Sequence, residues 1–374
     1  AASLRSAGAE YVVLTSKYHD GFALWPSGVA HPRGSRLQAE RDLVGDLTAS
    51  VRGAGMRMGL YYSGGYDWSV HDLVMRRNAD AMLAMPADPD YERYAGAHVR
   101  ELIDRYRPSV LWNDIGWPGG GDLAGLFAHY YEQVPDGVIN DRWAEGPARR
   151  TRLDRLIAQG IGSFTELFWP LMPDSFKRVG FPAAKHADFV TPEYRTFDEI
   201  REGKWEQTRG IGHSFALNRN EGPEDMIAVD ELIHGLVDVV SKNGNMLLGV
   251  GPAADGSVPP EQLRVLEALG AWLRTNGTAV KGTRPWRTAE GRTDRGVPLR
   301  FTRSDEAVHA ILLDAKPASG PHTLTEFEVS AAPSTVELLG IGPVEHGVVD
   351  GRLSVTIPDR LPDSPAHALR IIGA

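Results

Sequence analysis

Short runs of β-branched and aromatic residues recur along the first two thirds of the chain, and each ends in polar or glycine-rich sequence. Apolar runs of about four to eight residues bounded by turn residues are typical of buried strands. The sequence therefore predicts strands at Tyr11–Thr15, Met56–Tyr62, Ser109–Asn113, Gly137–Asp141 and Asn245–Val250.

Helical patterns separate several of these strands. Residues 41–54 place Leu43, Leu47 and Val51 at intervals of four, as expected for one face of a helix. Residues 91–106 also carry an apolar helical face, and Pro108 ends that predicted helix. The order of strand, helix and strand predicts a parallel α/β fold.

The pattern changes after a further helix predicted over 259–276. From about Trp286 onward the chain carries only short alternating strands separated by Gly, Pro and Asp, which indicates a small antiparallel β-sandwich. A length of 374 residues also favours two domains, because single cores stop growing near roughly 250–300 residues. We therefore predict one domain over 1–285 and a β-sandwich domain over 286–374.

Residues capable of chemistry cluster directly after the predicted strands. In a (β/α) barrel these strand ends form one face, where such enzymes place their active sites, and an open doubly wound sheet would also bind ligands there. No G-x-G-x-x-G turn or P-loop is present, which argues against a nucleotide site. The clustered residues are Tyr18, His19, Asp20, Tyr61, Asp67, Trp112, Asp114, Asp141 and Arg142.

Composition excludes several classes of partner and chemistry. The formal net charge is −9 without any basic stripe, so nucleic acid is not expected as a partner. No apolar run approaches the roughly 18–20 residues that a membrane helix needs, so no membrane partner is expected either. Cysteine is absent, which removes disulfides, thiolate nucleophiles and cysteine-based zinc sites.

One strand end has the features of a sugar site. The sequence VLWNDIGW places Asp114 at the end of an apolar strand between Trp112 and Trp117. Glycoside hydrolysis needs two carboxyl groups and aromatic surfaces shaped to a sugar, whereas an isolated Asp at this place could simply cap a loop. The pair of tryptophans favours the sugar site.

Eight ordered segments, spread from about Gly8 to Trp286, resemble the signature segments of the glycoside hydrolase family 29 α-L-fucosidases. The resemblance implies a somewhat irregular (β/α) barrel followed by a β-sandwich, a retaining double displacement on terminal α-L-fucosides, and no metal or organic cofactor. The implied substrate is a fucosylated oligosaccharide or glycoconjugate. The segments are TSKYHDGFALWPS, RDLVGDL, GLYYSGGYDW, SVLWNDIGWP, VINDRW, TPEY, KWEQTRGIGHSFALNRNEGPE and LVDVVSKNGNMLLGVGPAADGSVP.

The resemblance assigns roles to both carboxyl groups. Asp114 matches the family's nucleophile, and Glu193 in TPEY matches the general acid/base of close bacterial members. Glu221 and Glu206 are the alternative carboxyls for the second role. Retention implies that the two carboxyl groups lie about 5–5.5 Å apart.

Further matches assign a sugar pocket. Trp112, Trp25, Tyr61 and Arg142 match pocket residues, and His19 matches one of two adjacent histidines that bind sugar hydroxyls. Tyr18 replaces the other histidine, and its phenol can still form a hydrogen bond but is bulkier. A same-fold glycosidase for a related sugar, such as a β-galactoside or another 6-deoxy sugar, is therefore the alternative function.

The family carries the first barrel strands before the point where this sequence starts. The resemblance thus implies a barrel lacking its first strands, with any signal peptide upstream, so compartment is left unassigned. A non-catalytic carbohydrate-binding fragment is a further alternative. A metal-dependent hydrolase is disfavoured, because no His-x-His pair follows a strand. The sequence leaves homo-oligomerisation open.

Overall fold

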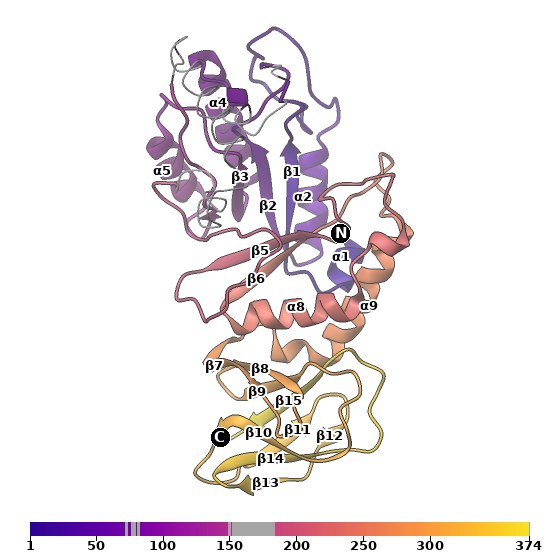
Figure 1. The fold of residues 1–374 in the computed structure, drawn as a ribbon. Helices are drawn as coiled ribbons and strands as arrows, with labels where there is room; N and C mark the ends of the chain where they lie inside the picture. Colours follow the sequence, from indigo (N-terminus) through magenta and orange to yellow (C-terminus); the bar gives the residue numbers. More distant parts are fainter. Residues whose placement is uncertain (72–73, 76–79, 81–82, 149–150, 152–183, 374) are drawn as a thin grey trace, which may run out of the picture. The chain divides into compact units, whose positions relative to one another are not determined.

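The computed structural model describes residues 1–71, 74–75, 80, 83–148, 151 and 184–373, and it divides into two compact units (Figure 1). The N-terminal unit contains Ala1 and Glu10–Val190, and the C-terminal unit contains Ala2–Ala9 and Thr191–Ala374. Among the described helices, none has the length and apolar character that crossing a lipid bilayer would require.

The N-terminal unit is built on a four-stranded sheet in the order β1-β2-β3-β4. All three neighbouring pairs are parallel, which confirms the parallel fold predicted from the strand and helix order. The strands are β1 (Tyr11–Lys17), β2 (Arg57–Ser63), β3 (Val110–Asp114) and β4 (Val138–Ile139).

β4 is shorter than the predicted strand over 137–141, and the side chain of Asn140 explains why. Its Oδ1 accepts a hydrogen bond from the Asn113 backbone nitrogen at 3.0 Å, and its Nδ2 donates to the Asn113 carbonyl oxygen at 2.8 Å. The amide side chain therefore takes the place that a continuing β4 backbone would occupy beside β3.

The helices of this unit begin at aspartate caps. Asp42 and Asp122 accept hydrogen bonds from the backbone nitrogens of Gly45 and Gly125, and Asp88 caps a helix that starts with proline. The predicted helix before Pro108 ends where Arg107 adopts a left-handed conformation. The helices are α2 (Leu43–Gly53), α4 (Pro89–Tyr106) and α5 (Leu123–Gln133).

The C-terminal unit begins with a parallel strand pair and helices around an apolar core. Its core includes Leu232, Val237, Leu266, Leu269 and Trp272, which come from the buried faces of two helices. The elements are α1 (Ala2–Ser6), β5 (Trp205–Gly210), η2 (Pro223–Asp225), α8 (Val229–Ser241), β6 (Gly244–Gly249), α9 (Pro260–Asn276) and η3 (Gly277–Ala279).

Two antiparallel sheets complete this unit and confirm the antiparallel region predicted from about Trp286 (Figure 1). A six-stranded sheet has the order β12-β11-β15-β9-β8-β7, and a three-stranded sheet has the order β10-β14-β13. Both contribute to one apolar core, for example through Phe301, Phe327 and Val355. The strands are β7 (Arg284–Arg292), β8 (Pro298–Arg303), β9 (Val308–Leu312), β10 (Gly320–Glu328), β11 (Thr335–Leu338), β12 (Gly342–Pro343), β13 (His346–Val349), β14 (Arg352–Ile357) and β15 (His367–Ile372).

Candidate active site

The register of the N-terminal sheet brings the predicted site residues to one edge. β2 and β3 pair Tyr61 with Trp112 and Ser63 with Asp114, so these residues lie at the carboxyl ends of adjacent strands. Ligands of parallel α/β folds bind at this edge. The structure thus groups here the residues that the sequence pattern placed after separate strands.

Both oxygens of the Asp114 carboxylate are held by hydrogen bonds. Oδ2 accepts from the Tyr61 hydroxyl at 2.9 Å, and Oδ1 accepts from Arg142 Nη1 at 3.0 Å and from the Ile115 backbone nitrogen at 2.9 Å. The Asp114 side chain is 14% exposed. It therefore has one fixed orientation while remaining accessible.

Asn113 positions the two loops that meet at this carboxylate. Its Nδ2 donates to the carbonyl oxygens of Gly116 at 2.8 Å and Arg142 at 2.7 Å. The chain turns sharply directly after Asp114, with positive φ at both Ile115 and Gly116. Sequence reasoning missed this role, although an Asn within a buried strand is a signal because buried polar groups need partners.

The stacked rings of Tyr61 and Trp112 form an aromatic wall beside Asp114. The rings of Tyr61 and Trp112 stack at 5.4 Å with an interplanar angle of 21°, and the Arg142 guanidinium lies 4.9 Å from the Trp112 ring centroid. Burial and the Asp114 charge raise the pKa of Tyr61 far above its usual value. The phenol therefore stays protonated and donates a hydrogen bond to Asp114.

His19 lies among aromatic rings next to this wall. Its ring stacks on Tyr18 at 4.0 Å and meets the edges of Tyr66 and Trp68 at 5.2 and 5.7 Å. Tyr18 and Trp68 are 48% and 45% exposed, so both offer apolar surface to a ligand. Burial lowers the pKa of His19.

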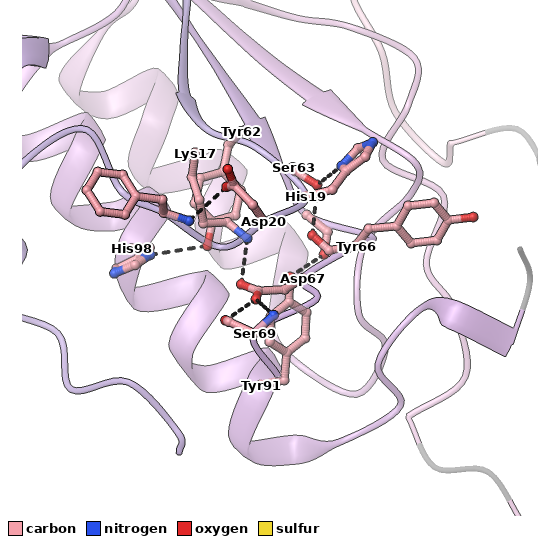
Figure 2. Close-up of polar contacts among 12 residues, drawn as sticks. Lys17, His19, Asp20, Tyr62, Ser63, Tyr66, Asp67, Ser69, Tyr91 and His98 are labelled. Carbon is pink, nitrogen blue, oxygen red and sulfur yellow. Dashed lines mark hydrogen bonds and ion pairs between the residues drawn. The ribbon is translucent and has the colours of Figure 1, made fainter. Parts of the chain in front are cut away.

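A buried ion pair supports this edge of the sheet (Figure 2). Lys17 Nζ lies 2.8 Å from Asp67 Oδ2, and both side chains are fully buried. Asp67 Oδ1 also accepts hydrogen bonds from the backbone nitrogen and hydroxyl of Ser69. The pair thereby fixes the loop that carries Trp68, whose backbone nitrogen donates to the His19 carbonyl oxygen at 2.7 Å.

Trp25 does not join the residues around Asp114. Its side chain is fully buried, its Nε1 donates to Glu101 at 3.0 Å, and its ring packs against His98. Here Trp25 is part of the packing of the N-terminal unit.

Glu193 belongs to the C-terminal unit, in a loop that runs beside β5. It forms a parallel bridge with Thr208, and hydrogen bonds from Tyr194 and Thr208 fix the backbone on either side. Glu193 is exposed, whereas Glu206 is buried in β5. Glu221 accepts from the Ser214 hydroxyl at 2.6 Å and from Asn218 Nδ2 at 3.1 Å. Of the three carboxyls considered, Glu193 is the one presented on a surface.

No group of three or more His, Asp or Glu side chains suited to a metal ion occurs among the described residues. What the described part of the site offers is a fixed carboxylate, an arginine, two phenols, an imidazole and exposed indole surface. Such groups bind sugar hydroxyls and stack on the apolar faces of sugar rings.

The family model and the similar known proteins all point to the same family. A family model described as α-L-fucosidase matches residues 1–162 and 175–278. An α-L-fucosidase of Branchiostoma floridae is 30% identical over 386 residues, covering 99% of this chain and 76% of that protein. The tissue α-L-fucosidase of Rattus norvegicus is 29% identical, covering 99% of this chain and 72% of its own.

Solved structures agree with these relatives. The structure of Thermotoga maritima α-fucosidase in complex with fucose matches with a TM-score of 0.81 and 38% identity, over 99% of this chain and 77% of that one. α-L-Fucosidase isoenzyme 1 from Paenibacillus thiaminolyticus matches with a TM-score of 0.75 and 26% identity, over 100% of this chain and 85% of that one. The chain therefore belongs to the α-L-fucosidase family of glycoside hydrolases.

Proposed function

We propose that the protein hydrolyses terminal α-L-fucosides with retention of configuration, through a covalent glycosyl-enzyme on Asp114. The observation that carries the proposal is the Asp114 carboxylate at the end of β3, fixed by Tyr61 and Arg142 beside an aromatic wall. A nucleophilic carboxylate must present one oxygen to the anomeric carbon without reorganising, and these contacts provide that orientation.

We further propose that the parallel strands β1 to β6 belong to a (β/α) barrel over residues 1–285. A β-sandwich domain over 286–374 would follow it. The parallel pairing within each set of strands and the helices between them support this architecture. The family resemblance supports it as well.

In the proposed first step, an Asp114 oxygen attacks the anomeric carbon as the bond to the leaving oxygen breaks. Glu193 donates its proton to that oxygen. In the second step, the Glu193 carboxylate takes a proton from water, and the resulting hydroxide attacks the anomeric carbon and releases Asp114. Two inversions give net retention. Tyr18, His19, Trp112 and Arg142 would bind the sugar, and Trp25 would support the pocket from its buried position.

Two variants test these roles on an aryl α-L-fucoside and on a fucoside with a poor leaving group. Asp114→Gly removes the attacking carboxylate, so hydrolysis of both substrates should fall by several orders of magnitude. Glu193→Ala should lose most activity on the poor leaving group but still form the intermediate from the aryl fucoside. Added azide needs no deprotonation and should restore turnover as a glycosyl azide of retained configuration.

Asp20→Asn provides a matched control, because Asp20 lies after the same sheet edge and an asparagine Oδ1 can still accept the hydrogen bond from the Phe22 backbone nitrogen. It should retain activity. Equal loss on both substrates without azide rescue would move the acid/base role of Glu193 to Glu221 or Glu206. Turnover of an aryl β-galactoside in place of the fucoside would favour a related sugar, and binding without turnover would favour a carbohydrate-binding role.

A further inference from the structure

The hydrogen-bond partner of His19 determines which of its ring nitrogens carries a proton. His19 Nδ1 lies 2.6 Å from the hydroxyl oxygen of Ser63, the last residue of β2. The same hydroxyl lies 2.8 Å from the carbonyl oxygen of Tyr66 (Figure 2). Ser63 is fully buried, so water does not compete for these bonds.

Counting protons leaves one arrangement for a neutral ring. A carbonyl oxygen only accepts hydrogen bonds, so the single hydroxyl proton of Ser63 is given to Tyr66. Ser63 can then only accept from His19, which places the proton on Nδ1. A neutral imidazole carries one N–H, so Nε2 is left with its lone pair as an acceptor.

The surroundings of His19 favour this neutral ring. Burial lowers its pKa and the Lys17 charge acts in the same direction, while Asp114 and Asp20 oppose them. Stacking on Tyr18 and the edge contacts of Tyr66 and Trp68 hold the ring plane in place. Within the part of the chain that the structure describes, Nε2 forms no hydrogen bond with the protein. His19 therefore presents a fixed acceptor beside Asp114.

We propose that Ser63 is a positioning residue that makes the site selective for a sugar hydroxyl able to donate a hydrogen bond to His19 Nε2. The inference rests on the proposed function, because it concerns how the same site chooses its sugar. A fucose analogue in which that hydroxyl is replaced by hydrogen, fluorine or a methyl ether cannot donate. It should be rejected, because a buried polar group left without its partner weakens binding.

The first test reads the ring directly and needs no turnover. Nitrogen-15 NMR of histidine-labelled protein near pH 7 should show His19 with a protonated Nδ1 and an unprotonated Nε2. Ser63→Ala should shift the population toward the Nε2-protonated form, and Ser63→Thr, which keeps the hydroxyl, should restore it. Ser69→Ala is the matched control, since Ser69 bonds Asp67 and His31 and should leave the His19 tautomer unchanged.

The second test measures equilibrium binding of L-fucose and its monodeoxy and deoxyfluoro analogues by ligand-observed NMR. At the ring position whose hydroxyl donates to His19 Nε2, the deoxy and the deoxyfluoro analogue should both bind the wild-type protein at least about tenfold more weakly than L-fucose. In the Ser63→Ala variant, the affinity for this deoxyfluoro analogue should come within a few-fold of the affinity for L-fucose, because a protonated Nε2 can donate a hydrogen bond to fluorine.

The outcomes separate this inference from the proposed function. A protonated Nε2 in the wild-type protein would overturn the inference while fucoside hydrolysis stands. Wild-type binding of every fluoro analogue as tight as that of L-fucose would also overturn it. Absence of fucoside hydrolysis together with the expected tautomer would instead refute the proposed function and, with it, the sugar-selective role of Ser63.

Discussion

The carboxyl edge of the N-terminal sheet and the core between the antiparallel sheets both contain fully buried side chains, but of different kinds. At the sheet edge Lys17, Ser63, Asp67, Asn113 and Asn140 are fully buried, and each has a named hydrogen-bond partner. The antiparallel core is formed by aliphatic residues and phenylalanines. Burying polar groups contributes little net stability, so the first region is organised for geometry and the second for stability.

The largest expected effect comes from breaking the buried ion pair. Asp67→Asn should lower the free energy of unfolding by about 3–5 kcal/mol, because it leaves the charge of Lys17 buried without its counter-ion. Urea denaturation followed by amide exchange of β1 and β2 measures the loss.

The double variant Lys17→Met with Asp67→Leu is the control for this prediction. It removes both charges and should regain most of the stability, because apolar pairs often replace buried ion pairs at no net loss. Catalytic activity should stay impaired, since Asp67 would no longer fix the loop of Trp68. A double variant as unstable as the single one would show that packing rather than charge is responsible.

A pH titration of stability compares one buried histidine from each unit, His98 of α4 and His309 of β9. Burial lowers the pKa of His98 to about 3, with the Lys17 charge as the next cause. Burial likewise lowers the pKa of His309 in β9 to about 4. In the unfolded chain both histidines have a pKa of about 6.5. Below that pH the unfolded chain therefore binds protons that the two histidines of the folded chain do not bind.

Stability should therefore be fully present above about pH 6.5 and should fall as the pH decreases toward these folded values. Each histidine contributes at most about 1.4 kcal/mol per pH unit, and His98 acts over the wider window. Replacing His98 by Gln should flatten the curve more than replacing His309 by Gln. Parallel curves for wild type and both variants would contradict this assignment.

The two regions also differ in how far the sequence predicted them. The strands at the start of the N-terminal sheet were predicted to within one or two residues, and the antiparallel region was predicted as a whole from about Trp286, because apolar runs and alternation follow directly from burial. β5 was missed, since Trp205–Gly210 reads as a polar segment although Glu206, Gln207 and Thr208 are all buried. A hydropathy pattern cannot reveal burial of polar groups.

The prediction of the site residues was limited in the same way, because the sequence pattern does not show which polar groups face one another. Asp114, Tyr61, Trp112 and Arg142 were predicted from strand ends and motif resemblance, and the structure brings them into contact. The role of Ser63 depends on the Tyr66 carbonyl that faces it, and no spacing in the sequence encodes that contact.

A single methylene tests the packing of the antiparallel core. Ile371 in β15 is fully buried among aliphatic side chains, so Ile371→Val should lower the free energy of unfolding by about 0.5–1.5 kcal/mol. The loss should be independent of pH and salt, since no charge is involved. Exchange rates of the β9 and β11 amides report it locally. A loss near zero would mean that this core is loosely packed, whereas protein interiors are normally close-packed.

The smallest expected effect comes from an ion pair chemically like Lys17–Asp67 but on the surface. Arg41 Nε lies 2.6 Å from Asp46 Oδ2, with side chains 77% and 53% exposed. Water screens this attraction, and Arg41 precedes the N-cap of α2, where a positive charge opposes the helix dipole. Arg41→Ala should therefore change the free energy of unfolding by less than about 0.5 kcal/mol, and added salt should reduce even that. A loss above about 1 kcal/mol by urea denaturation would mean that burial is not what separates the two pairs, because the shorter contact would then carry the energy regardless of solvent.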